Sequence, residues 1–171
     1  MEKILQRYRP NVGVMLFNRD AQVWIGRRVG GFADIDPVFG EGPDQWRWQM
    51  PQGGIDEGED IETAARRELK EETGVSSATI IAVTPGWLAY DFPPAYKKKH
   101  WKGQRQKWAA MQFDGSTSEV VLDADEHQEF DDWRWAELEE VTDLIVPFKR
   151  HVYAEIVSAF TPLRDFMRRQ K

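Results

Sequence analysis

Residues 53–75 read GGIDEGEDIETAARRELKEETGV and decide the fold of this 171-residue chain. A helix is predicted from Ile61 to Thr73, because apolar residues recur every four positions from Ile61 onward. Asp60 stands where an N-cap is expected, and Gly74 stands where a left-handed C′ glycine ends many helices. This stretch therefore predicts a turn, a helix of about three and a half turns and a sharp stop.

The predicted helix carries Glu68, Glu71 and Glu72 at spacings i, i+3 and i+4, so the three side chains share one face. Like charges at this spacing destabilise an isolated helix by about 0.2–0.5 kcal/mol per pair. A divalent cation on that face would reverse the effect, and carboxylate oxygens suit Mg²⁺ or Mn²⁺. The alternative is a solvated acidic face, neutralised by neighbours such as Arg66 and Arg67.

The spacing extends over the whole stretch. Gly53 is followed after five residues by Glu59, and after seven more by the run Arg67-Glu68-Leu69, then Glu71-Glu72 and Gly74-Val75. With no mismatched position, this pattern resembles the Nudix box. The resemblance implies an α+β fold, a Nudix αβα sandwich with a mixed β-sheet and the Nudix helix at about 61–73. It also implies a structural salt bridge between Glu59 and Arg67, and core positions for Leu69 and Val75.

The resemblance further implies a divalent-metal site with Mg²⁺ or Mn²⁺ as cofactor. In the family, glutamates that match Glu68, Glu71 and Glu72 bind metal, and one of them also serves as base; which one is left open. The backbone carbonyl that matches Gly53 often joins the metal shell. Glu129 matches a further metal ligand or base on a loop facing the helix; the alternative is that it is one of several acidic residues of a solvated loop. Such metals neutralise phosphate charge and activate water, so no covalent nucleophile is needed.

Similarity beyond the box covers roughly residues 8–160. Residues 8–13 (YRPNVG) look like the start of bacterial RNA pyrophosphohydrolases, and residues 48–54 (WQMPQGG) look like both those enzymes and plant-type dinucleoside tetraphosphate hydrolases. Residues 90–94 (YDFPP) lean toward the plant type. The expected activity is removal of pyrophosphate from a 5′-triphosphorylated RNA end. The alternative is asymmetric cleavage of a dinucleoside polyphosphate, diadenosine tetraphosphate, to ATP and AMP.

Several residues match substrate-binding positions of the family. Arg27 is an alternative to Arg28, because adjacent strand residues face opposite ways. Phe148 also begins the apolar stripe of a second helix, predicted at about 148–160, so core packing is an alternative for it. The expected substrate-binding residues are Arg9, Arg28, Tyr90, Val146, Phe148 and Lys149.

The remaining segments predict strands and one unusual loop. Residues 30–44 hold four glycines and two prolines without periodicity, and predict a surface loop longer than in compact bacterial relatives. The basic segment 97–107 is either a solvated loop or a surface that steers polyphosphate into the site. Strands are expected at residues 12–17 and 22–28 as a hairpin, at 46–50, at 78–90 with a break at Pro85-Gly86, at 106–113 and at 133–135.

Composition excludes several classes of function. The chain has no cysteine, which rules out disulfides, zinc–thiolate sites and thiol nucleophiles, and its net charge of −6 argues against duplex DNA as a partner. No apolar run reaches the ~20 residues of a membrane helix, and the first residues lack the features of a secretory signal. A single cytoplasmic domain over residues 1–171 is expected, with no membrane partner; nothing indicates the oligomeric state. A non-catalytic binding module of the same fold is disfavoured, because such modules usually lose box glutamates.

Overall fold

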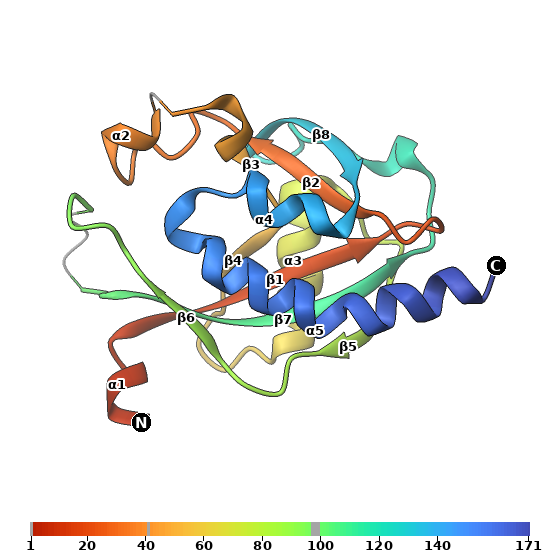
Figure 1. Ribbon diagram of the computed structural model, residues 1–171, viewed down its shortest axis with the longest axis horizontal. Coiled ribbons are helices and arrows are strands. Elements are labelled where there is room, and N and C mark those ends of the chain that lie inside the picture. The colour runs from red at the N-terminus through yellow and green to blue at the C-terminus, as the bar shows by residue number, and fades with distance from the viewer. Residues whose placement is uncertain (1, 41, 97–99) are drawn as a thin grey trace.

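Figure 1 shows a computed structural model of the protein, which describes residues 2–40, 42–96 and 100–171. The lysines at 97–99, part of the predicted steering segment, lie outside the described residues. The strands are β1 (Tyr8–Phe17), β2 (Val23–Arg28), β3 (Trp48–Gln49), β4 (Gln52–Gly54), β5 (Ala78–Val83), β6 (Leu88–Asp91), β7 (Gly103–Phe113) and β8 (Phe130–Ala136). The helices are α1 (Glu2–Leu5), α2 (Pro37–Gly40), α3 (Ile61–Thr73), α4 (Val141–Leu144) and α5 (Arg150–Arg169), with 3₁₀ turns η1 (Asp44–Arg47), η2 (Thr117–Glu119), η3 (Leu138–Glu140) and η4 (Pro147–Lys149).

The described strands form one mixed sheet. Its main order is β3-β2-β1-β7-β5, while β4 pairs with β1, β6 with β7 and β8 with β2. β1 and β7 are parallel along their length, and the other pairs are antiparallel. The predicted β1–β2 hairpin is confirmed, and its turn is closed because Asn18 Oδ1 accepts from the backbone N–H groups of Asp20 and Gln22, both at 2.9 Å.

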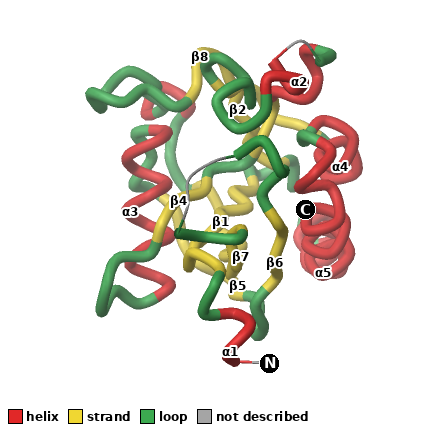
Figure 2. Tube along the Cα trace, turned by 90° about the vertical axis from the view of Figure 1, so that its left-hand side faces the viewer, coloured by secondary structure: helices red, strands yellow, loops and turns green. Residues whose placement is uncertain are grey.

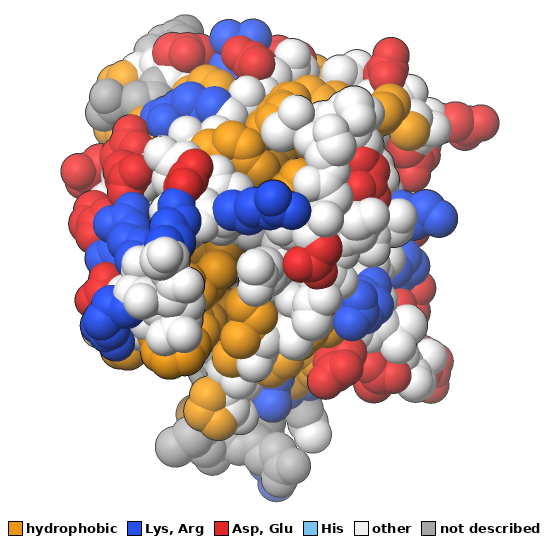
Figure 3. All heavy atoms as spheres, turned by 90° about the vertical axis from the view of Figure 1, so that its right-hand side faces the viewer, with side chains coloured by type: hydrophobic (Ala, Val, Ile, Leu, Met, Phe, Trp, Pro, Cys, Tyr) orange, Lys and Arg blue, Asp and Glu red, His pale blue; other side chains and the backbone are white. Residues whose placement is uncertain are grey.

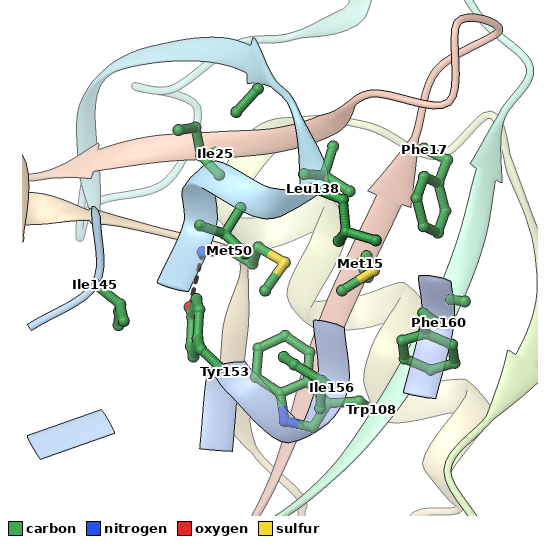
Figure 4. Close-up of a cluster of buried hydrophobic side chains, with 14 of the residues drawn as sticks. Met15, Phe17, Ile25, Met50, Trp108, Leu138, Ile145, Tyr153, Ile156 and Phe160 are labelled. Carbon is green, nitrogen blue, oxygen red and sulfur yellow. Dashed lines mark hydrogen bonds between the residues drawn. The ribbon is translucent and has the colours of Figure 1, made fainter. Parts of the chain in front are cut away.

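Helices cover both faces of this sheet. Figure 2 shows α3 on one side of the strands and α4 and α5 on the other. On the α5 side, Met15, Trp108 and Ile156 are fully buried, and the backbone N–H of Met50 donates to the hydroxyl of Tyr153 at 3.0 Å (Figure 4). On the α3 side a second apolar cluster fills the space between helix and sheet. The expected mixed-sheet αβα architecture is therefore confirmed.

The bounds of α3 agree with the prediction. Asp60 caps its start by accepting from the backbone N–H of Thr63 at 2.9 Å. Gly74 ends it with a φ of 78°, a left-handed conformation that favours glycine. Leu69 and Val75 are buried, so both expected core positions are confirmed.

The other elements differ from the prediction mainly in length. α5 runs on past Pro162 to Arg169, because Leu163 and Met167 still pack on the core and Arg164 Nη2 bonds Glu139 Oε1 at 2.7 Å. The strand expected at 46–50 is reduced to two residues, since residues 44–47 form a 3₁₀ turn.

The segment at residues 30–44 is not simply a surface loop. Gly30 and Gly31 have φ values of 68° and 60° and form a turn directly after β2. Phe32, which follows, is only 1% exposed and belongs to the α5-side core, with Ile35 and Phe39 packed against that core. The prediction was wrong here because isolated apolar residues without periodicity give no sign that they are buried.

Figure 3 shows the end of the molecule near the C-terminus, where hydrophobic side chains lie exposed in the middle and side chains of both charge signs surround them. Among the described residues, no helix combines the length and apolarity needed to cross a membrane.

Candidate active site

A polar cavity of about 210 Å³ opens between β1, β4, β6 and the segment after β2. It brings together seven of the residues singled out from sequence: Arg9, Arg28, Gly53, Glu72, Tyr90, Glu129 and Lys149. A larger hollow of about 360 Å³ lies behind α3, but its described lining residues include no Asp or Glu. The polar cavity is therefore the candidate active site.

Glu72 projects from the last turn of α3 into this cavity. Its Oε2 accepts from the backbone N–H of Gln52 at 3.0 Å. Burial raises the pKa of Glu72 well above its ordinary value, and the nearby Glu129 and Glu68 carboxylates raise it further. A carboxylate held in this way gains strongly from any cation that enters the cavity.

Glu68 lies one turn earlier against the glycine loop. Burial raises the pKa of this carboxyl, although the adjacent Arg67 opposes that shift. A Cβ atom on Gly53 would lie 2.0 Å from Glu68 Oε2, so any side chain there would displace the carboxylate. Glycine at this position therefore lets the backbone of β4 approach Glu68 closely.

Arg67 ties the loop before α3 to the helix. Its guanidinium bonds both Glu59 oxygens at 2.8 Å, so the expected Glu59–Arg67 salt bridge is confirmed. The same group contacts Glu68 Oε1 at 2.8 Å and Glu71 Oε2 at 3.2 Å, and donates to the Gly54 carbonyl at 2.8 Å. Arg67 thereby pairs with two of the three helix glutamates that were expected to bind metal.

Replacing Arg67 with Gln is expected to cost about 1–2 kcal/mol of unfolding free energy near neutral pH. The Arg67 contact lowers the pKa of Glu59 to about 2, so this contribution is complete above the ordinary glutamate pKa and disappears as pH falls toward about 2. Urea unfolding at neutral and acid pH measures the difference. Arg66→Gln, on the same helix, serves as control. If Arg67→Gln lost the same unfolding free energy at both pH values, the assignment would be contradicted.

Glu129 and Arg28 face each other across the β2–β8 pair. Arg28 Nε donates to Glu129 Oε1 at 2.9 Å, and the backbone N–H of Val29 donates to the Glu129 carbonyl at 2.9 Å. Arg27 instead pairs with Asp131 at 2.7 Å and does not line the cavity. Of the two arginines left open by the sequence, Arg28 therefore lines the cavity and Arg27 does not.

Lys149 is a buried cation, only 3% exposed. Its Nζ donates to Gln49 Oε1 at 3.3 Å and to Gln52 Oε1 at 3.2 Å. Burial lowers the pKa of Lys149 to about 7, and the Arg28 charge adds to this shift. A phosphate in the cavity would add to the negative charge that Glu129 and Glu72 already place near Lys149.

Two of the expected substrate-binding residues, Val146 and Phe148, do not line the cavity. Val146 has no exposed surface and belongs to the core. The ring of Phe148 contacts the rings of Phe32 and Tyr90, at centroid distances of 6.0 and 5.7 Å, and does not line the cavity. Phe148 thus packs against the core, the alternative that the sequence left open, and Phe32 from the segment after β2 lines the cavity instead.

Sequence reasoning missed the amide side chains of the site. Gln106 Nε2 donates to Asn11 Oδ1 at 2.8 Å and to Gln52 Oε1 at 3.2 Å, and Gln49 and Gln52 orient Lys149. The available signal was their position: Asn11, Gln49 and Gln106 are polar residues on strands that are otherwise buried. Buried amides are kept only when hydrogen-bonded, which marks a polar site.

The predicted metal ligands do not converge in this structure. Across the described ranges, no three His, Asp or Glu side chains are grouped closely enough to hold a metal ion. Glu68 and Glu71 turn toward Arg67, while Glu72 and Glu129 face the cavity. The donor set nevertheless has the chemistry of a hard divalent cation site, since it combines carboxylates with a close backbone strand at Gly53.

Comparison with known proteins identifies the family. The NUDIX domain model matches residues 7–156. An RNA pyrophosphohydrolase of Caulobacter vibrioides is 53% identical over 159 residues, covering 90% of this chain and 86% of the relative. RNA pyrophosphohydrolases of Rhodopseudomonas palustris and Bartonella bacilliformis are 48% and 44% identical, with coverage of 91% and 90% of this chain and 93% and 91% of theirs.

Solved structures agree on the fold. A C. elegans Ap4A hydrolase binary complex superposes with a TM-score of 0.57 at 20% identity, covering 92% of this chain and 97% of that one. The E. coli dihydroneopterin triphosphate pyrophosphohydrolase superposes with a TM-score of 0.60 at 17% identity, covering 89% and 98%. The chain therefore belongs to the NUDIX family, as a Nudix hydrolase.

Proposed function

We propose that this chain is an RNA pyrophosphohydrolase, which removes pyrophosphate from the 5′ end of triphosphorylated RNA. The observation that carries the proposal is the cavity itself, whose lining combines the cations Arg9, Arg28 and Lys149 with the carboxylates of Glu72 and Glu129. The cations can hold the phosphate chain, and the carboxylates can provide for metal and water. The relatives that bear this name match the chain over about nine tenths of its length.

Nudix hydrolases generally use divalent metal ions. We assign Mg²⁺ or Mn²⁺ here, with Glu68, Glu71, Glu72 and Glu129 and the Gly53 carbonyl as the groups that would hold it. When bound, such a cation neutralises phosphate charge and lowers the pKa of a water molecule. The close approach of Gly53 to Glu68 supports this assignment, as do the raised carboxyl pKa values of Glu68 and Glu72.

The protein's own cations position the phosphate chain. Arg28 offers a planar fork that binds phosphate oxygens in pairs, whereas Lys149 offers a buried point charge. Arg9 is exposed at the rim, and its guanidinium lies across Gly54. Tyr90 lines the cavity, where its hydroxyl donates to Gln104 Oε1. Among the carboxylates, Glu72 or Glu129 would accept the proton of the attacking water.

The second candidate is asymmetric cleavage of diadenosine tetraphosphate to ATP and AMP. It is favoured by residues 90–94 (YDFPP), which place Tyr90 and Phe92 in the cavity lining. Both reactions break a phosphoanhydride in a polyphosphate chain, so the same cations and carboxylates serve either substrate. The named relatives favour the RNA reaction, whereas the solved Ap4A hydrolases, at about 20% identity, support the fold alone.

A paired assay with Mg²⁺ tests the proposal. Release of pyrophosphate from 5′-triphosphorylated RNA and cleavage of diadenosine tetraphosphate are compared as kcat/KM for the same preparation. We expect the RNA reaction to dominate. A dinucleotide kcat/KM many orders of magnitude above the RNA value would overturn the RNA assignment, and absence of both activities would overturn each candidate.

The setting of the activity belongs to the same proposal. Residues 1–171 act as a single domain, which is supported by the packing of Phe160, Leu163 and Met167 of α5 on the shared core. We place this domain in the cytoplasm, where RNA ends are available, and give it neither a membrane nor duplex DNA as partner. The lack of cysteine and the net charge of −6 support this placement.

A further inference from the structure

Arg28 holds two carboxylates at once. Its Nε donates to Glu129 Oε1 at 2.9 Å, whereas Nη1 and Nη2 donate to Asp34 Oδ1 and Oδ2 at 2.8 and 3.2 Å. Asp34 and Arg28 both line the cavity. The contact with Asp34 is the parallel, two-bond arrangement that a guanidinium makes equally well with a carboxylate or a phosphate.

We propose that Asp34 sets the affinity of the site by competing with the phosphate chain of the substrate for Arg28. The inference rests on the proposed function, in which Arg28 binds phosphate. Of the five guanidinium N–H groups, Glu129 takes the one on Nε, the Gly31 carbonyl takes one on Nη1, and Asp34 takes one on each of Nη1 and Nη2. Asp34 therefore occupies the Nη1–Nη2 edge, the fork that makes two parallel bonds to a phosphate. A phosphate that binds this fork must therefore replace the Asp34 carboxylate.

The contact is built so that Asp34 can leave and Arg28 stays. The Asp34 side chain is 61% exposed and becomes hydrated when displaced, whereas that of Arg28 is 17% exposed and remains held by Glu129. Phe32, which is buried, anchors the segment on one side, and α2 follows on the other. The exchange therefore takes place between Phe32 and Phe39, both of which pack against the core.

Competition of this kind has a definite thermodynamic signature. A contact that occupies the donor groups of Arg28 lowers the apparent affinity of every ligand that binds Arg28 by the same factor. The binding of the product pyrophosphate is weakened as much as the binding of the substrate. Asp34 therefore speeds product release at the expense of substrate affinity. Ligands that do not reach Arg28 are unaffected.

The test is calorimetric binding of inorganic pyrophosphate, with Mg²⁺ present, to wild type and Asp34→Asn. We expect the dissociation constant to fall by about two- to fivefold in Asp34→Asn. Asp44→Asn, which removes the same charge from a residue outside the cavity, should leave the value unchanged. In an Arg28→Gln background, Asp34→Asn should have no effect.

Three results would overturn the inference: an unchanged affinity in Asp34→Asn, an equal gain in Asp44→Asn, or a gain that persists without Arg28. Failure of pyrophosphate to bind either protein would also count against it. Melting curves of each variant confirm that the fold is retained. If Asp34→Asn tightens pyrophosphate binding but triphosphorylated RNA is not cleaved, only the proposed substrate is wrong. If RNA is cleaved but the pyrophosphate affinity is unchanged in Asp34→Asn, only the proposed role of Asp34 is wrong.

Discussion

Glu72→Gln is expected to lower kcat by about a thousandfold or more on whichever polyphosphate the enzyme cleaves. Glu72 is an enclosed carboxylate beside Glu129 and Glu68, and its backbone contact with Gln52 fixes its direction. The amide of Gln keeps the size and part of the hydrogen bonding but carries no charge. It therefore loses both the attraction for a divalent cation and the capacity to accept a proton.

The same substitution is expected not to destabilise the metal-free fold. Because burial and like charges raise the pKa of Glu72, the folded state binds the proton more tightly than the unfolded state. Wild-type stability is then lost as pH rises from the ordinary glutamate value, about 4.3, through the raised value. Gln removes that loss, so the variant should melt at the same or a higher temperature at neutral pH. Addition of Mg²⁺ should raise the melting temperature of wild type more than that of the variant.

Glu62→Gln is the matched control, since Glu62 is an exposed glutamate on the first turn of the same helix. It should retain turnover and respond to Mg²⁺ like wild type. Full activity in a folded Glu72→Gln protein would remove Glu72 from the metal site and from catalysis. A large drop in the melting temperature of the metal-free variant would show that its charge stabilises the fold, contrary to the direction of its pKa shift.

Sequence alone predicts α3 to its last residue, because each determinant is local. The cap at Asp60, the apolar stripe and the left-handed glycine at Gly74 all lie within fifteen residues of one another. The face shared by Glu68, Glu71 and Glu72 follows from helix geometry in the same way. The family resemblance added Glu59 as the partner of Arg67, and their contact confirms it.

Elements whose limits depend on distant partners were predicted less well. β7 begins at Gly103 because it pairs there with Tyr8 of β1, a parallel contact that no local pattern encodes. α5 passes the proline at 162 because its later residues still find a core and an ion pair with Glu139. Local signals place an element, and tertiary contacts set its length.

The site shows the same division between local and distant information. The glutamate face was predictable, but the pairing of Arg28 with Glu129 joins residues 101 positions apart. The choice between Arg27 and Arg28 depends on the β2–β8 register, which shifts between these two residues. Phe148 takes the core position that the sequence left open as its alternative, beside Phe32 from a segment without any pattern.

Lys149→Met is expected to lower kcat/KM by about thirty- to a hundredfold, because truncating one member of a buried charge pair with the substrate phosphate costs about 2–3 kcal/mol. Met has a similar length and no charge, so the buried stem stays filled. Gln49 and Gln52, which accept from Lys149 in the free enzyme, would lose that donor but keep contact with the cavity. Lys70→Met, at an exposed lysine on α3, is the control and should leave kcat/KM unchanged.

The pH dependence separates charge from packing. Since the pKa of Lys149 is lowered to about 7, its charge is lost as pH rises through that value. Wild-type kcat/KM should therefore fall as pH rises above about 7. Stability moves the other way: between about 7 and the ordinary lysine value near 10.4, the unfolded chain binds more protons, so wild-type stability rises with pH. Lys149→Met should lack both slopes. If kcat/KM of the variant still falls above neutral pH, the fall in rate belongs to another group, and Lys149 binds substrate without titrating. If the variant matches wild type in kcat/KM, the phosphate chain does not reach this side of the cavity, and Arg28 must bind it without Lys149.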